Sequence, residues 1–270
     1  MVRLLRTVKE KVTQGIHQPQ PDTTITDVFL TVHGVRHRAL NRRRWGDWQQ
    51  LLLEWMVQYH GATVRVVNFR YWYVPAILSW LVSIFRLADR WSRRYLKYLN
   101  IVCEQFPNAR IHLVGHSRGT DIIHYACEQD PDIVVDSIHL MAGVVSSHVE
   151  NTVFERMLST GQVRRVVSYF SKKDLVVKFA PPPYGHLGYW GFIHSPQDLE
   201  VARFQPYPHF SLYNLEFCVG HCGYWLGEDH HVTFTWLYQM ATLPKASLYE
   251  EVKPLQTRGT GTAPLFLKVD

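Results

Sequence analysis

Cysteine is scarce in this chain, and its apolar runs are short. Only 4 of the 270 residues are cysteine, which is too few for a scaffold held together by disulfides. The basic residues Arg3, Arg6, Lys9 and Lys11 are not accompanied by an apolar segment of the kind that a secretory signal contains. We therefore expect a reducing, cytoplasmic setting, with peripheral membrane contact as an open alternative.

The uncharged stretch from Tyr71 to Phe85 is too short to cross a membrane as a straight helix. It has fifteen residues, whereas such a helix needs about 20. Its many aromatic residues fit either a lid or acyl-binding wall that touches lipid, or a helix buried against a sheet. Residues 1–12 have apolar positions at helical spacing, which predicts an amphipathic helix that docks on the protein itself or lies on a membrane surface.

Charge of one sign is not in large excess, since the net charge is +6. Basic residues gather in two groups, but no nucleic-acid-binding motif accompanies them, so we expect no nucleic-acid partner. Solvated faces are the simpler interpretation, and attraction to anionic membranes or acidic substrates is the alternative. The two groups consist of Arg36, Arg38, Arg42, Arg43 and Arg44, and of Arg90, Arg93, Arg94 and Lys97.

No internal repeat or low-complexity block divides the chain, so we expect one domain over residues 1–243 and a loose tail over 244–270. Strand-like and helix-like segments alternate, which predicts an α/β fold whose mostly parallel sheet is flanked by helices on both faces. The expected strands are 27–32, 62–69, 109–114, 136–141, 163–170 and 213–219, and the clearest helices are 45–59, 87–104 and 231–240.

The most informative motif is Gly-His-Ser-Arg-Gly at residues 115–119. It separates the β-forming residues 109–114 from an amphipathic run that begins near Asp121, which puts Ser117 on a sharp strand-to-helix turn. Glycines in such a turn let the strand and helix approach closely while the serine adopts a strained backbone conformation. The context predicts a nucleophile elbow, and an incidental serine in a glycine-rich turn is the alternative.

A serine nucleophile needs a base, and the base needs a carboxylate that fixes its tautomer. In a sheet of this type the order along the chain is serine, acid, histidine, each after a strand. Asp174 comes just after the expected strand 163–170, and this makes it the favoured acid. Its competitors, none of which follows a strand so directly, are Asp132, Asp136 and Asp198.

The base is chosen among several histidines. His221 follows the last expected strand by two residues and precedes the closing helix, as the base should. His230 and His231 are alternatives, although they could instead cap that helix. His116 sits beside the nucleophile on a tight turn, where its side chain points away from the direction of attack, so we expect it to line the site or to pack.

An oxyanion hole requires backbone donors directed at the developing negative charge. One donor is expected at the amide of Arg118, directly after the nucleophile. The other is expected in the turn that ends strand 27–32, where His33 and Gly34 permit an unusual conformation and Val35 supplies the amide. A plain strand-ending turn is the alternative.

Together these motifs resemble the α/β-hydrolases of the serine esterase/lipase type, over His33 to about Met240. The segment Gly220–Trp225 is similar to the Gly-His-x-x-Tyr-Trp/Phe segment that carries the base in some bacterial and fungal lipase-like hydrolases. The chain departs from the fuller pattern in having little room for one or two early strands and no obvious cap, although residues 181–208 are a candidate cover for the site. The resemblance implies a triad of Ser117, Asp174 and His221, oxyanion amides at Val35 and Arg118, and supporting roles for His33, Gly34, Gly115 and Gly119.

These expectations favour a hydrolase that cleaves a small-molecule or lipid ester, with an apolar acyl group, through an acyl-serine. No metal or organic cofactor is expected, because Cys218, His221 and Cys222 provide only three ligands without a spaced partner pair. Two alternatives stay open: the same triad could serve an acyltransferase, thioesterase or amidase, or the chain could be a catalytically silent binding protein at a membrane.

Overall fold

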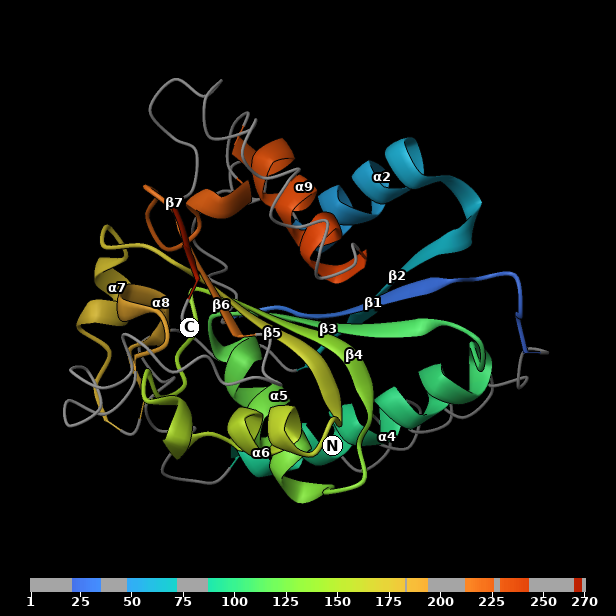
Figure 1. The fold of residues 1–270 in the computed structure, drawn as a ribbon, viewed down its shortest axis with the longest axis horizontal. Coiled ribbons are helices and arrows are strands. Elements are labelled where there is room, and N and C mark those ends of the chain that lie inside the picture. Colours follow the sequence, from blue (N-terminus) through green and yellow to red (C-terminus); the bar gives the residue numbers. More distant parts are fainter. Residues whose placement is uncertain are drawn as a thin grey trace, which may run out of the picture.

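The computed structural model describes residues 21–34, 48–71, 87–182, 184–193, 212–225, 229–242 and 265–268. In this part of the chain, seven strands form one sheet in the order β2-β1-β3-β4-β5-β6-β7 (Figure 1). Strands β1 to β6 run parallel, and β7 pairs antiparallel to β6. The predicted α/β class with a mostly parallel sheet is confirmed.

The strands are separated by helices, as the sequence predicts. The strands are β1 Asp27–Val32, β2 Val64–Phe69, β3 Arg110–His116, β4 Val135–Met141, β5 Val163–Phe170, β6 Leu212–Glu216 and β7 Leu265–Lys268. The α-helices are α2 Trp48–His60, α4 Leu87–Gln105, α5 Arg118–Gln129, α6 Val153–Ser159, α7 Leu175–Lys178, α8 Leu187–Trp190 and α9 Asp229–Thr242. Short 3-10 helices cover Gly61–Thr63, Val149–Asn151 and Gly223–Trp225.

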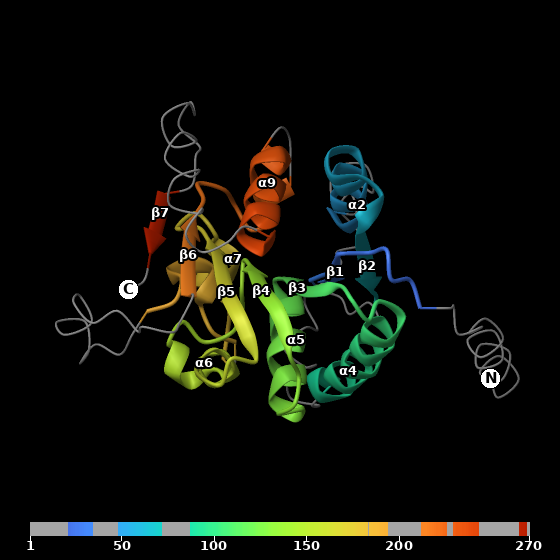
Figure 2. The same ribbon diagram turned by 45° about the vertical axis from the view of Figure 1, so that its right-hand side comes forward.

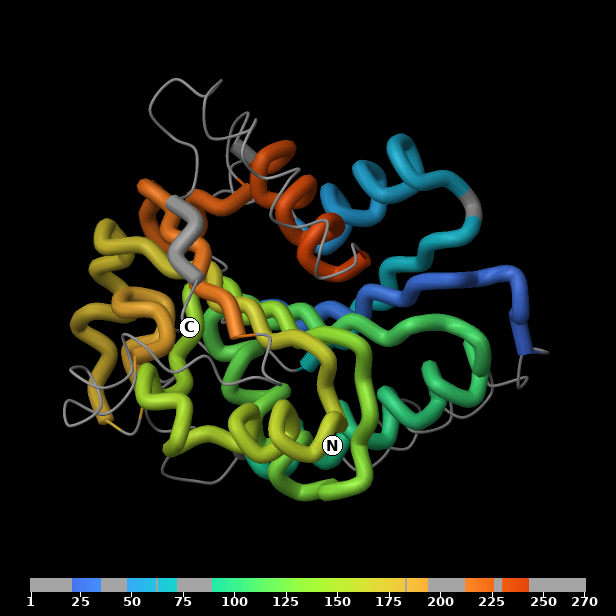
Figure 3. The backbone as a smooth tube through the Cα atoms, viewed as in Figure 1, coloured from blue at the N-terminus to red at the C-terminus, as the bar shows by residue number. Residues whose placement is uncertain are grey.

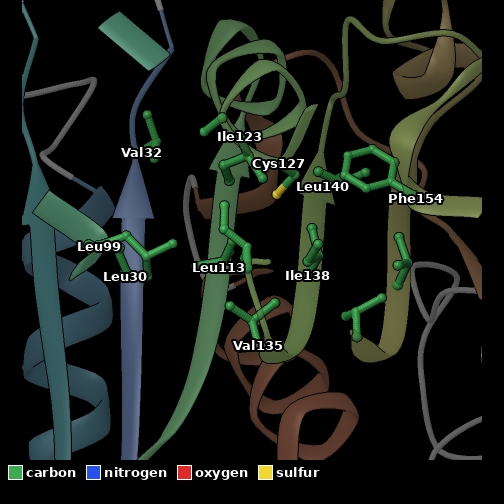
Figure 4. Packing of buried hydrophobic residues seen from close by; sticks show 14 of the residues in the cluster. Leu30, Val32, Leu99, Leu113, Ile123, Cys127, Val135, Ile138, Leu140 and Phe154 are labelled. Carbon is green, nitrogen blue, oxygen red and sulfur yellow. The ribbon is translucent and has the colours of Figure 1, made fainter. Parts of the chain in front are cut away.

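Helices cover both faces of the sheet (Figure 2): α2 and α9 lie on one face, and α4, α5 and α6 lie on the other. On the α4–α6 face, the strand register aligns Leu30 of β1 with Leu113 of β3, and Leu113 with Ile138 of β4. Figure 4 shows this buried row. The central strands β1, β3, β4 and β5 are therefore buried on both faces, which explains why they are rich in apolar residues.

A chain of buried polar side chains crosses the α2–α9 face of the sheet. The Nε2 of His112 lies 2.9 Å from an oxygen of Asp27, and its Nδ1 lies 2.7 Å from the hydroxyl of Ser137. That hydroxyl is 2.8 Å from Nε2 of His139, whose Nδ1 is 2.9 Å from the hydroxyl of Tyr169. Because the Asp27 carboxylate only accepts, every donor in the chain points the same way: Tyr169 to His139 to Ser137 to His112 to Asp27.

Parallel pairing brings the carboxyl ends of the strands to one edge. Val32 is level with Gly115, and His116 is level with Met141. Met141 is in turn level with Tyr169. Ligands of open α/β sheets bind at this edge, so a functional site is expected in the loops that follow β1, β3, β5 and β6.

Several predictions concern residues outside those that the structure describes: the helix over residues 1–12, the basic group at 36–44, and all of the uncharged stretch except Tyr71. In the expected loose tail, residues 265–268 form strand β7, because they pair with β6 at the edge of the sheet. Among the described helices, none is both long and apolar enough to cross a membrane.

Candidate functional site

Ser117 lies at the sharp turn from β3 into α5 and has an uncommon backbone conformation. Its φ of 52° and ψ of −123° fall in a region that L-residues rarely adopt. The close packing of α5 against β1 explains Gly119: a Cβ there would lie 2.3 Å from the carbonyl oxygen of Val32. The hydroxyl of Thr120 donates to the Ser117 carbonyl at 2.6 Å and accepts from the Val144 amide at 3.1 Å, which fixes the turn to the end of β4.

The end of β1 lies directly beside the serine. A Cβ on Gly34 would be 2.8 Å from the Cβ of Ser117, so glycine is required by this approach. The ring of His33 stacks on Tyr71 with centroids 4.4 Å apart, and its Nδ1–H donates to the Gly34 carbonyl at 2.5 Å. Val35, whose amide is predicted as an oxyanion donor, lies outside the described residues.

Three of the predicted site residues meet in one hydrogen-bonded line. The Oγ of Ser117 is 3.0 Å from Nε2 of His221. The Nδ1 of His221 is 2.9 Å from Oδ2 and 3.1 Å from Oδ1 of Asp174. The Asp174 side chain is fully buried, whereas that of His221 is 15% exposed. The line therefore runs from a fully buried carboxylate, through a slightly exposed imidazole, to the hydroxyl of Ser117, a residue that is 9% exposed.

Asp174 is held from its own side of the site. It is the N-cap of α7, and its Oδ1 accepts from the Val177 amide at 3.0 Å. Nearby, the hydroxyl of Ser171 accepts from the amides of Lys173 at 3.1 Å and Val219 at 3.2 Å. Because Lys173 precedes the acid and Val219 precedes the histidine segment, one buried hydroxyl ties the two loops together.

The segment that carries His221 is anchored by aromatic side chains. The hydroxyl of Tyr224 donates to the Tyr169 carbonyl at 3.2 Å. The ring of Trp225 lies edge-on to that of His116, with centroids 4.3 Å apart. These contacts explain why tyrosine and tryptophan follow the histidine.

His116 supports His221 and is not aligned with the nucleophile. Its Nε2–H donates to the His221 carbonyl at 3.0 Å, because a carbonyl oxygen can only accept. Burial, reinforced by the neighbouring His221, holds the pKa of His116 well below its usual range. His116 is therefore a neutral hydrogen-bond donor, a contact that the sequence pattern did not reveal.

The rival histidines lie elsewhere. His231 packs edge-on against Tyr59 of α2, and His230 packs near Phe234 in the first turns of α9. The imidazole that faces Ser117 belongs to His221.

The rival acids are also distant from this line. Asp136 lies at the amino end of β4, where Arg164 pairs with it at 2.6 Å. Asp132 accompanies the turn before that strand, and its amide donates to Asp130. Asp198 lies outside the described residues.

A buried arginine adjoins the serine. The guanidinium of Arg118 lies over the rings of Trp91 and Tyr184, 5.3 and 5.4 Å from their centroids, and donates to the Tyr184 hydroxyl. Tyr184 comes from the stretch proposed as a cover, of which the structure describes 181, 182 and 184–193.

Burial raises the pKa of Asp121, one turn into α5, to about 6 even though Arg118 is close.

The cysteine-histidine cluster does not assemble as a metal site in the part of the chain that is described, where no group of three metal-ligating side chains occurs. His221 is engaged by Asp174 and Ser117. Burial raises the pKa of the Cys222 thiol to about 12, which keeps it protonated.

Comparison with known proteins identifies the family. A family model described as the alpha/beta hydrolase fold matches residues 83–227, more than half of the chain. The chain belongs to the α/β-hydrolase family. The predicted family membership is confirmed, and it supports hydrolase activity for this chain. Ser117, Asp174 and His221 all fall inside the matched region of this α/β-hydrolase.

Two solved structures are similar to this chain at low sequence identity. TT1662 from Thermus thermophilus is 14% identical, with a TM-score of 0.50, over 83% of this chain and 92% of that one. A candidate cell surface hydrolase from Lactobacillus plantarum WCFS1 is 10% identical, with a TM-score of 0.44, over 84% and 97% of the two chains. A search of curated proteins gave no match. At this identity, the likeness to TT1662 concerns the fold alone.

Proposed function

We propose that this protein is a serine hydrolase that cleaves a carboxylic ester through an acyl-serine intermediate. The observation that carries the proposal is the hydrogen-bonded line from Ser117 through His221 to buried Asp174. Its distances are those at which a base can remove the hydroxyl proton while the carboxylate fixes the tautomer. Placement of the serine on a strained turn at the carboxyl edge of the sheet supports the same function.

The first half of the reaction forms the acyl-enzyme. The Ser117 oxygen attacks the ester carbonyl while Nε2 of His221 takes the hydroxyl proton, and Asp174 stabilises the resulting imidazolium. The carbonyl oxygen becomes an oxyanion, which the amides of Arg118 and Val35 would bind. When the tetrahedral intermediate collapses, the ester C–O bond breaks and His221 returns the proton to the departing alcohol.

The second half releases the acid. Water attacks the acyl-serine and gives its proton to Nε2 of His221, and collapse of the second intermediate breaks the bond to Ser117 and returns that proton to the serine oxygen. Each oxyanion donor contributes roughly 3–4 kcal/mol in comparable sites. The cycle thus combines covalent catalysis by Ser117 with proton transfers through His221.

We favour an ester with an apolar acyl group as substrate. An ester asks less of the leaving-group chemistry than an amide, because an alcohol departs more readily than an amine. The aromatic rings of Trp91 and Tyr184 pack on the guanidinium of Arg118, the residue after Ser117, which places aromatic side chains in the neighbourhood of the nucleophile. A lipid ester is the finer proposal within this class.

The test is labelling with a fluorophosphonate probe, together with hydrolysis of a soluble short-chain ester. Ser117→Ala should abolish labelling, and His221→Ala should lower turnover by about 10⁴-fold or more. Asp174→Ala should lower turnover by about 10⁴-fold. His231→Ala, which removes a histidine that packs on Tyr59, is the matched control and should behave like the wild type.

The outcomes separate this proposal from its rivals. Ester turnover that survives Ser117→Ala would overturn the mechanism, and loss in His231→Ala but not in His221→Ala would overturn the choice of base. If added alcohol or amine outcompetes water for the acyl group, the enzyme is an acyltransferase. If folded wild type neither labels nor turns over any ester, thioester or amide, the site is catalytically silent.

A further inference from the structure

An exposed apolar surface lies next to the candidate site, on the two short helices that follow β5. Leu175 and Val176 of α7 are 57% and 61% exposed, and Phe179 is 73% exposed. Trp190, the last residue of α8, is 51% exposed. The two helices pack together at one end of the molecule (Figure 1; the chain path is clearest in Figure 3). A gathering of large exposed apolar side chains marks an interaction surface.

The same surface is positively charged. Lys172, Lys173 and Lys178 are exposed. The only acidic residue between 171 and 193 is Asp174, which is buried and bonded to His221. Glu216 at the end of β6 offsets part of the charge of Lys172, so the surface keeps a net positive charge. We call these residues the α7–α8 patch: Lys172, Lys173, Leu175, Val176, Lys178, Phe179 and Trp190.

Charge and apolar surface are interleaved in the patch. The Nζ of Lys172 is 3.7 Å from the centroid of the Trp190 ring, and that of Lys178 is 5.4 Å from the centroid of Phe179. Lysines beside exposed Trp and Phe are the composition of surfaces that lie at the boundary between water and lipid headgroups, where aromatic rings enter the interface and ammonium groups meet anionic lipids.

We propose that the α7–α8 patch docks the protein on a lipid surface that carries anionic headgroups. Asp174 is the N-cap of α7, so docking through α7 would bring the loops around Ser117 to the lipid. Binding itself is independent of hydrolysis, and only this consequence for substrate access rests on the proposed function. An apolar ester dissolved in a membrane would then reach the serine without crossing water.

The test is sedimentation with phosphatidylcholine vesicles that contain or lack phosphatidylserine, using the full chain in a Ser117→Ala background so that hydrolysis cannot change the lipid. One variant, Val176→Glu with Phe179→Glu, removes the apolar contact. Its control is Val134→Glu, which adds a negative charge at a similarly exposed valine (68%) directly before β4, at the amino end of that strand.

A second variant removes the charge by changing Lys172, Lys173 and Lys178 to Gln. Its matched control changes three exposed cations of α4 in the same way: Arg93, Arg94 and Lys97. We expect the Ser117→Ala protein with an unchanged patch to prefer phosphatidylserine vesicles. Each lysine near such a surface changes partitioning by a factor of about five, so the triple variant should lose at least about tenfold. The Val176/Phe179 variant should lose a similar factor, and both controls should bind normally.

Binding that is unchanged in both patch variants, or wild type that binds no vesicle, would overturn the proposal. So would a wild-type dimer that Val176→Glu with Phe179→Glu dissociates while vesicles do not bind, since the patch would then join copies of the chain. Turnover of a soluble ester, measured with Ser117 intact, distinguishes failure of one proposal from failure of the other. Turnover without vesicle binding would contradict only the docking proposal, and vesicle binding without turnover would contradict only the proposed hydrolase activity. Circular dichroism verifies that each variant is folded.

Discussion

Removing one hydroxyl from the buried polar chain should destabilise the protein, whereas removing another buried hydroxyl should not. Tyr169→Phe deletes the donor to Nδ1 of His139, a bond of 2.9 Å between fully buried side chains. The imidazole nitrogen would then be buried without a partner, which costs about 1–3 kcal/mol. The shape of the ring is retained, so no large cavity contributes.

Tyr95→Phe is the matched control. Tyr95 is as deeply buried as Tyr169, but in the described part of the chain its hydroxyl has no hydrogen-bond partner. Deleting that hydroxyl leaves nothing unsatisfied, and the free energy of unfolding should change by less than about 0.5 kcal/mol or rise slightly.

Urea unfolding at pH 7.5, followed by circular dichroism and tryptophan fluorescence, measures both variants. The difference in unfolding free energy at unchanged m-value should lie near 1–3 kcal/mol, which corresponds to about 2–4 °C of melting temperature for each kcal/mol. If the two variants lose the same stability, the cost belongs to repacking of the rings, and the directed hydrogen-bond chain does not contribute.

Two further predictions concern acid and packing. Burial lowers the pKa of His112 and His139 in the folded protein. Well above pH 6.5 both histidines are neutral in the folded and the unfolded chain, but below pH 6.5 only the unfolded chain takes up the protons, so the free energy of unfolding should fall as the pH drops. A free energy of unfolding that stays constant between pH 7 and 5 would contradict this. At Asp27, burial raises the pKa, but hydrogen bonds from His112, Arg110 and Thr26 outweigh this effect and lower the pKa to about 2. Protonation of Asp27 should therefore lower the free energy of unfolding further, beginning near pH 4 and ending only below about pH 2. Gly119→Ala should lower the free energy of unfolding by at least about 2 kcal/mol, because the added methyl group overpacks the contact between α5 and β1. Gly220→Ala is the control and should lower it much less, because a Cβ there meets nothing within 4 Å. Equal losses in urea unfolding would refute the close approach of α5 to β1.

The sheet could be predicted from sequence because its strands are short apolar runs between helical periods. The predicted bounds of β1 and β5 agree with the structure. The predicted strand at 62–69 began too early, because Gly61–Thr63 form a 3-10 turn that leads into β2. Helices α7 and α8 were not predicted, because four residues are too few to show a helical period.

The order of the candidate site residues could also be predicted, since each follows a strand and parallel strands end at one edge. The contacts that hold them could not. Ser171 and Val219 are 48 positions apart, and His116 meets the His221 carbonyl across 105 positions. Such pairings depend on the path of loops that no local periodicity describes. Val35 also illustrates the limit, because its expected role depends on a loop outside the described residues.

The anchoring contacts suggest which part of this protein sets reactivity and which part sets access. Thr120 fixes the serine turn, Ser171 ties the acid loop to the histidine loop, and His116 holds the histidine backbone. All three anchors are buried polar side chains, so contacts within the protein itself hold the line from Ser117 to Asp174. The α7–α8 patch flanks Asp174 on both sides in the sequence, and its side chains are exposed to solvent. A change in the patch should therefore alter how substrate is delivered and leave the chemistry intact, whereas a change in an anchor should do the reverse.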